Sequence, residues 1–203
     1  LYRRADLTAL RQYAVASDGQ QENLGALALT HLLATDPNLP VAKSHPAPTD
    51  VELSKLERKL VTSPNRSVHW DARNPNTAHV IIETPRTVAV WGLIANQSFK
   101  VGPFNLDFGD CERDYAVFVA TSLDNRTLDE SDSILVTVVG NAENQAMGWN
   151  ADRTSVGTRW GHGPTLGNGI SVNLKMNGRF RCHALTGTGS PQSEVRISDS
   201  GFP

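Results

Sequence analysis

Short strand-like runs, separated by turn residues, dominate the chain from about residue 61 onward and limit the folds that it can adopt. The runs are rich in β-branched and aromatic residues and cover positions 67–71, 79–83, 87–93, 98–101, 104–108, 115–121, 134–139, 169–174, 179–184 and 194–197. Asn, Asp, Gly and Pro separate them, and Asn177-Gly178 is typical of a two-residue hairpin turn. With almost no helical periodicity between the runs, the pattern predicts a mainly β fold, an antiparallel β-sandwich.

The first 60 residues follow a different pattern. Apolar residues recur at helical spacing within residues 20–34 and 50–60, which predicts two short helices. The segment between them, residues 36–49, holds four prolines and is typical of a linker. We therefore expect a helical and Pro-rich extension or linker over residues 1–60, followed by a β-sandwich domain over residues 61–203.

Charge and composition exclude several classes of partner. The chain has 203 residues and a formal net charge of −2, so it lacks the basic field that attracts nucleic acid or an acidic membrane surface. Its apolar runs are shorter than the roughly 20 residues that span a bilayer. We expect no nucleic-acid or membrane partner. Because the first residue is Leu1 rather than Met, we interpret the chain as a piece or a trimmed product of a longer polypeptide.

The two cysteines leave a choice open. Cys111 and Cys182 both lie in or beside predicted strands. They are either joined in a disulfide or present as two free thiols, because sequence does not supply the geometry that a disulfide requires.

Residues 133–169 carry the most distinctive functional pattern. The β-branched run 134–139 predicts a buried strand, and a long polar segment with two tryptophans follows it. Indole stacks on the apolar face of a sugar ring, while amides, carboxylates and guanidinium groups bind hydroxyls. The candidate ligand-binding residues are Trp149, Trp160, Asn150, Asp152, Arg153 and Arg159. Alternatively, the two indoles fasten the loop to its own domain or to a neighbouring one. Trp70 and Trp91 lie within predicted strands and are expected in the core.

Catalytic and metal sites have weaker support. Glycoside hydrolysis needs two carboxyl groups roughly 5–10 Å apart. Glu143 is the best single candidate, but no second carboxylate has a defensible position, and the sequence favours a role for Glu143 in binding loop N–H groups or Arg153. No Gly-x-Ser-x-Gly elbow is present. We assign no catalytic residue, no metal ligand and no cofactor. Two alternatives stay open: calcium at the acidic segment 104–114, against a simple solvated turn, and a metal site formed by His69, His79 or His162.

Several segments together resemble a known family. They are Thr84-Pro85-Arg86-Thr87 before a Val-rich strand, Phe99-Lys100-Val101-Gly102, Thr121-Ser122-Leu123-Asp124, the run Ser133 to Val139, and Ala142-Glu143-Asn144-x-x-Met147-x-Trp149-Asn150-x-x-Arg153-Thr154-Ser155-x-Gly157. This pattern, over about residues 60–197, is similar to the C-terminal β-sandwich region that follows the catalytic barrel in certain large bacterial glycoside hydrolases.

The resemblance implies a non-catalytic accessory or carbohydrate-binding module. Its partners would be a polysaccharide or oligosaccharide and the catalytic domain of the same parent polypeptide, in an extracellular or periplasmic location. In such enzymes the catalytic carboxylates lie on the barrel, which this chain does not contain. Two alternatives stay open: a catalytic part of a glycosidase that uses Glu143, and a purely structural brace between domains.

Overall fold

The structure of the protein is a computed structural model that describes residues 7–8, 32–33, 59–63, 65–178 and 180–195. Six strands form one antiparallel sheet in the order β10 (Ile134–Val139), β9 (Tyr115–Ser122), β6 (Thr87–Leu93), β5 (His79–Glu83), β4 (Val68–Asp71) and β3 (Leu60–Thr62). A second antiparallel sheet has the order β13 (Val172–Met176), β8 (Phe104–Phe108) and β7 (Ser98–Val101). The prediction of a mainly β fold with antiparallel sheets is confirmed.

Two hairpins and two short helical turns complete this part of the chain. The hairpins are β11 (Ala142–Gln145) with β12 (His162–Gly167), and β14 (Cys182–Leu185) with β15 (Pro191–Val195). The turns are the 3₁₀ segments η3 (Pro75–Thr77) and η4 (Glu112–Asp114).

The predicted N-terminal extension falls almost wholly outside the described residues. Within the expected helix 20–34, only Leu32–Leu33 is described, as strand β2, which pairs in parallel with β1 (Leu7–Thr8). These two residues are therefore extended and not helical. The first strand of the large sheet, β3, begins at Leu60.

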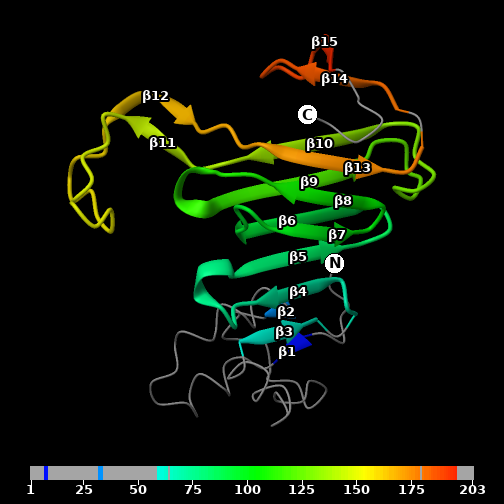
Figure 1. The fold of residues 1–203 in the computed structure, drawn as a ribbon, viewed down its shortest axis with the longest axis horizontal. Helices are drawn as coiled ribbons and strands as arrows, with labels where there is room; N and C mark the ends of the chain where they lie inside the picture. Colours follow the sequence, from blue (N-terminus) through cyan, green and yellow to red (C-terminus); the bar gives the residue numbers. More distant parts are fainter. Residues whose placement is uncertain (1–6, 9–31, 34–58, 64, 179, 196–203) are drawn as a thin grey trace, which may run out of the picture.

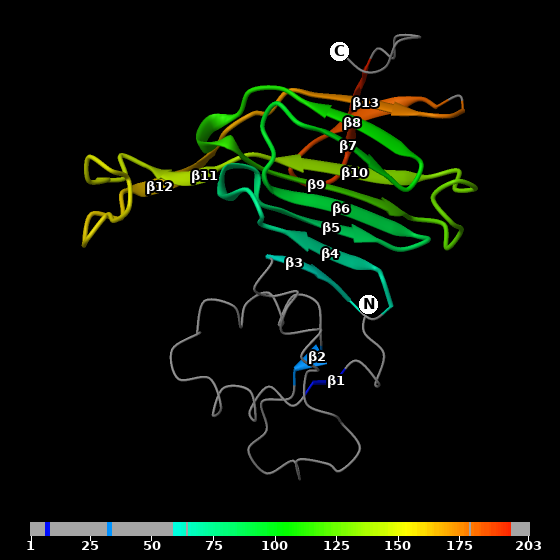
Figure 2. The same ribbon diagram turned by 60° about the horizontal axis from the view of Figure 1, so that its bottom comes forward.

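The two sheets share one apolar core, and Figures 1 and 2 show the three-stranded sheet lying over one face of the six-stranded sheet. Burial alternates with a period of two along β9 and β8, as expected where one face of a strand points inward. Phe118 of β9 is fully buried and lies edge-to-face with Phe104 and Phe108 of β8, with ring centroids 5.9 and 6.5 Å away. These aromatic contacts join the two layers.

The prediction that residues 134–139 form a buried strand is wrong in one respect. The run is a strand, β10, but it lies at the edge of the six-stranded sheet. Leu135, Val136 and Val139 are 38%, 41% and 43% exposed, and Ile134 and Val138 pack against the core. β-branched residues favour strands at the centre and at the edge alike, so composition alone did not reveal the position of β10 in the sheet.

The six-stranded sheet is apolar on both faces. One cross-strand row on the face away from the core consists, in register, of Val61, Trp70, Val80, Trp91, Val117 and Val139. Val61 and Val80 are 3% and 4% exposed, whereas Val139 is 43% exposed, so burial of this face declines toward β10. Trp70 and Trp91, expected in the core, are half-buried members of this outer row.

Candidate functional site

The segment that holds the predicted ligand-binding residues forms an arm. We use this name for residues 142–167, which comprise the hairpin β11–β12 and the loop that joins its strands. Figures 1 and 2 show the arm projecting from one end of the two sheets. Glu143 lies opposite Leu166 and Asn144 opposite Thr165 in the hairpin register.

The loop of the arm is folded on itself. Gly148 N donates to Arg159 O and Asn150 N to Ser155 O, both at 2.9 Å. The Asn150 side-chain oxygen accepts from the backbone N–H of Thr154 at 2.8 Å, so this predicted ligand residue shapes the loop. At Gly161, with φ of 71°, a Cβ atom would lie 2.4 Å from the carbonyl oxygen of Gln145, so only glycine fits.

A cluster of side chains around Trp149 ties the loop to the body of the protein. Glu143 Oε2 accepts hydrogen bonds from Trp149 Nε1 at 2.7 Å and from Arg153 Nη2 at 2.9 Å. The guanidinium groups of Arg113 and Arg153 lie 5.0 and 5.4 Å from the centroid of the Trp149 ring, within range of cation–π attraction. Arg113 also donates to the carbonyl oxygen of Arg153. Because Arg113 belongs to η4, the Trp149 cluster joins the arm to a distant segment of the chain.

The same cluster supplies the second carboxylate that sequence analysis did not find. Glu112 Oε1 lies 3.6 Å from Arg153 Nη2, the atom that also binds Glu143. Two carboxylates that contact one nitrogen are near neighbours, and glycoside hydrolases also use a pair of neighbouring carboxyl groups. However, Arg153 occupies the space between them, and with Arg113 the cluster holds two positive and two negative charges. The geometry is that of a neutral ion-pair network. No sequence signal pointed to Glu112, since the fold alone brings η4 to the arm.

The other predicted ligand residues lie on the surface of the loop. Trp160 is 62% exposed, and its carbonyl oxygen accepts a hydrogen bond from Asn144 Nδ2 at 3.0 Å. Arg159 and Asp152 are exposed, and neither side chain bonds to another described residue. The Arg159 stem lies along Gly148, whose Cβ position would fall 2.6 Å from Arg159 Cβ. The predicted set is thus divided: Trp149 and Arg153 belong to the cluster, while Trp160, Arg159 and Asp152 face solvent.

Metal and thiol chemistry have little support in the described part of the chain. There, no group of three or more His, Cys, Asp or Glu side chains is placed to hold a metal ion. In the acidic segment 104–114, Asp110 accepts a hydrogen bond from Asn96 Nδ2 at 2.7 Å. Cys111 and Cys182 are both free thiols, and partial burial raises the pKa of each. Among the described residues, no helix has the length and apolarity to cross a membrane.

Known proteins add no further assignment. No protein-family model, curated protein or solved structure matches this chain. A function must therefore be inferred from the residues of the chain itself.

Proposed function

We propose that this chain contains a non-catalytic β-sandwich module that binds polysaccharide through its arm, with Trp160 as the residue that stacks on a sugar ring. The observation that carries the proposal is the 62% exposure of Trp160 on a projecting, internally braced loop. When a pyranose covers an indole, apolar surface of both is removed from water, and the hydroxyl groups at the edge of the sugar stay free to form hydrogen bonds.

The Trp149 cluster supports this role indirectly. Because Glu143 and two arginines hold Trp149, the loop does not have to become ordered when a ligand arrives, which reduces the entropic cost of binding. Asp152 and Arg159 supply an acceptor and a donor for sugar hydroxyls close to Trp160 in the sequence.

The resemblance to the C-terminal region of bacterial glycoside hydrolases supports the wider context. Two antiparallel sheets that face each other across the core around Phe118 fit a β-sandwich. In this proposal the ligand is a polysaccharide or oligosaccharide, and the neighbour is the catalytic domain of the same polypeptide. The module then works in an extracellular or periplasmic location, as an accessory to hydrolysis.

Affinity electrophoresis through gels that contain different polysaccharides tests the proposal. We expect retention by at least one gel, and about a tenfold loss of affinity in Trp160→Ala, which corresponds to about 1.4 kcal/mol. Leu166→Ala is the matched control, because Leu166 is also an exposed apolar residue of the arm at 46%. Retention that is the same in Trp160→Ala and in the parent protein, or no retention by any gel, would refute the proposal.

A hydrolase that uses Glu143 is the second candidate, and the carboxylate of Glu112 on the far side of Arg153 favours it. This candidate predicts turnover of chromogenic glycosides by the chain, lost in Glu143→Gln and in Glu112→Gln. Absence of turnover by the folded chain counts against it.

A structural brace is the third candidate, and the apolar outer row of the six-stranded sheet favours it. The exposed end of that row at Val139 is the kind of surface that docks on a neighbouring domain. A brace predicts no affinity for any glycan, together with a loss of stability in the parent polypeptide when Val139 is replaced by Asp.

A further inference from the structure

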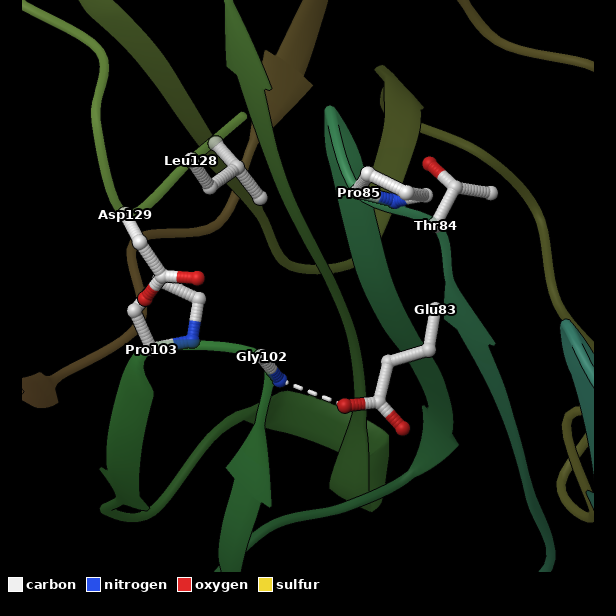
Figure 3. A pocket seen from close by; sticks show the side chains of 7 residues that line it. All are labelled: Glu83, Thr84, Pro85, Gly102, Pro103, Leu128 and Asp129. Carbon is white, nitrogen blue, oxygen red and sulfur yellow. Dashed lines mark hydrogen bonds between the residues drawn. The ribbon is translucent and has the colours of Figure 1, made fainter. Parts of the chain in front are cut away.

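A pocket with a volume of about 300 Å³ lies on a part of the surface that the arm does not reach. It is formed by Glu83 at the end of β5 with Pro85 in the next turn, by Gly102 and Pro103 in the turn from β7 to β8, and by Leu128 and Asp129 in the loop after β9 (Figure 3). Strands β5 and β9 run in the same direction and β10 in the opposite one, because successive pairs are antiparallel. The pocket and the arm therefore lie at opposite ends of the sheet.

The walls of this pocket are held in place by hydrogen bonds within the protein. Glu83 Oε1 accepts from Gly102 N at 2.6 Å, which joins two walls (Figure 3). Leu128 N donates to Pro85 O at 2.8 Å, and the Leu128 side chain is only 1% exposed. A ligand thus meets a preformed surface, which lowers the cost of binding.

The loop that carries Asp129 is braced by one carboxylate, Asp124. Its oxygens accept hydrogen bonds from the Ser122 and Ser131 hydroxyl groups, both at 2.9 Å, from Asp132 N at 2.7 Å and from Arg126 N at 3.2 Å. This arrangement fixes the position of Asp129 relative to the opposite wall.

The lining of the pocket is acidic. Figure 3 shows the carboxylates of Glu83 and Asp129 on opposite sides of it, and no lining residue is basic. Outside the lining, Arg126 pairs with Asp132 at 2.6 Å, whereas Arg86 donates to the neutral amide of Asn125 and Lys100 is exposed two residues before Gly102. Among the described residues, none forms a hydrogen bond or an ion pair with the Asp129 side chain. The complementary ligand is therefore a cation.

The lining favours an organic cation over a metal ion. Calcium takes six to eight oxygen ligands, whereas this pocket offers two carboxylates that face each other across an open space. Pro85 and Pro103 supply apolar walls against which a carbon skeleton packs favourably, and the buried Leu128 side chain lies beneath them. The volume is at the lower end of the roughly 300–1,000 Å³ typical of small-molecule sites, which suits a single ring.

We propose that this pocket binds an amino sugar, a pyranose whose free ammonium group lies between Glu83 and Asp129. The ammonium group donates hydrogen bonds to the two carboxylates, and the C–H face of the ring packs on the proline walls. The choice of a saccharide as the carrier of the cation rests on the proposed function. The choice of a cationic ligand and the location of its pocket do not depend on that function. The module then has two glycan contacts, with Trp160 on the arm and with the acidic pocket at the other end.

Amide chemical shifts of the full chain, titrated with a glucosamine trimer and with the matching N-acetylglucosamine trimer, test the proposal. The two probes have the same rings and differ in charge. We expect shifts at the Gly102 and Asp129 amides with the glucosamine trimer, and affinity lower by at least about tenfold for the acetylated one.

Two matched variants locate the contact. Asp129→Asn removes the free carboxylate and is expected to weaken glucosamine binding by about fivefold or more. Glu130→Gln removes the next carboxylate along the chain, which accepts a hydrogen bond from the Thr127 hydroxyl group, and is expected to change nothing. Both residues are exposed, so neither change is expected to unfold the chain.

Each outcome separates this inference from the proposed function. The pocket proposal is overturned if Asp129→Asn binds the glucosamine trimer as tightly as the parent protein. It is also overturned if shifts occur only at the arm and vanish in Trp160→Ala; glycan binding through the arm then remains supported. Pocket shifts that persist in Trp160→Ala support the pocket, even where no polysaccharide gel retains the protein. Lysine methyl ester that binds as tightly as the glucosamine trimer overturns the assignment to an amino sugar.

Discussion

Replacement of Glu143 by Ala is expected to loosen the loop of the arm and to leave the two sheets intact. Glu143 accepts two hydrogen bonds, one from Trp149 Nε1 and one from Arg153 Nη2. The Arg153 and Glu143 side chains are 41% and 23% exposed, so solvent reduces the bond between them to roughly 0.5–1 kcal/mol. The half-buried bond from Trp149 adds about 1 kcal/mol. The variant therefore loses about 2 kcal/mol locally, which is about 30-fold in the equilibrium for opening of the loop.

Native-state amide hydrogen exchange measures this change directly. The amides of Gly148 and Asn150 are bonded within the loop, and they are expected to exchange about 30-fold faster in Glu143→Ala, whereas β9 amides keep their rates. Asp152→Ala is the control, because Asp152 is an exposed acidic residue of the same loop with no described side-chain partner. Loop exchange that does not change, or that rises equally in β9, would refute the role of Glu143 as a local brace.

Three further changes test the fold. Phe118→Ala removes a fully buried ring and is expected to cost about 3–5 kcal/mol in denaturant unfolding; a loss below about 1 kcal/mol contradicts the assignment of this ring to the core. Gly92→Ala is expected to destabilise strongly, because its φ is 137° and a Cβ would lie 2.3 Å from the Ala78 carbonyl oxygen; Gly167→Ala, with no atom within 4 Å, is the near-neutral comparison, and equal midpoints contradict the argument. At Asp124, partial burial raises the pKa of the carboxyl group, but the four hydrogen bonds that it accepts lower the pKa by more. The pKa of Asp124 in the folded chain is therefore well below its ordinary value. The ionised carboxylate therefore stabilises the folded state fully above its unfolded pKa of about 4, and this stabilisation declines as the pH falls toward the lower folded pKa. Asp124→Asn is expected to lower the urea midpoint more at pH 7 than at pH 3, and equal losses at the two pH values contradict this prediction.

The strands that sequence analysis located best are those with an apolar pattern. The runs 79–83, 104–108 and 134–139 coincide with β5, β8 and β10, because alternating or β-branched residues both favour extended backbone and pack in a sheet. The strands of the arm were missed. β11 is Ala-Glu-Asn-Gln, and β12 contains two glycines and a proline, so neither shows the period of two that marks a strand with one buried face.

The candidate site was predictable only where its residues are close in sequence. The ion pair of Glu143 with Arg153, one of the roles expected for Glu143, links residues of the same segment. Glu112 and Arg113 complete the cluster from η4, and no spacing rule connects that turn to the arm. The two indoles illustrate the same limit: Trp149 has a carboxylate and two guanidinium groups within reach, whereas the Trp160 residue is held through its backbone carbonyl, and only the fold distinguishes them.

The same variant, Glu143→Ala, also separates the two functional candidates that involve the arm. If Glu143 acts only as a brace, glycan affinity falls in proportion to the fraction of molecules whose loop remains closed. A 30-fold rise in opening from about one molecule in a thousand leaves about 97% of the loops closed, so retention by a polysaccharide gel is expected to stay nearly unchanged. Trp160→Ala removes the stacking surface itself, so its affinity is expected to fall about tenfold at the same loop stability. A loss of affinity in Glu143→Ala far beyond the open fraction measured by hydrogen exchange would place Glu143 in contact with the ligand, and it would favour the hydrolase over the binding module.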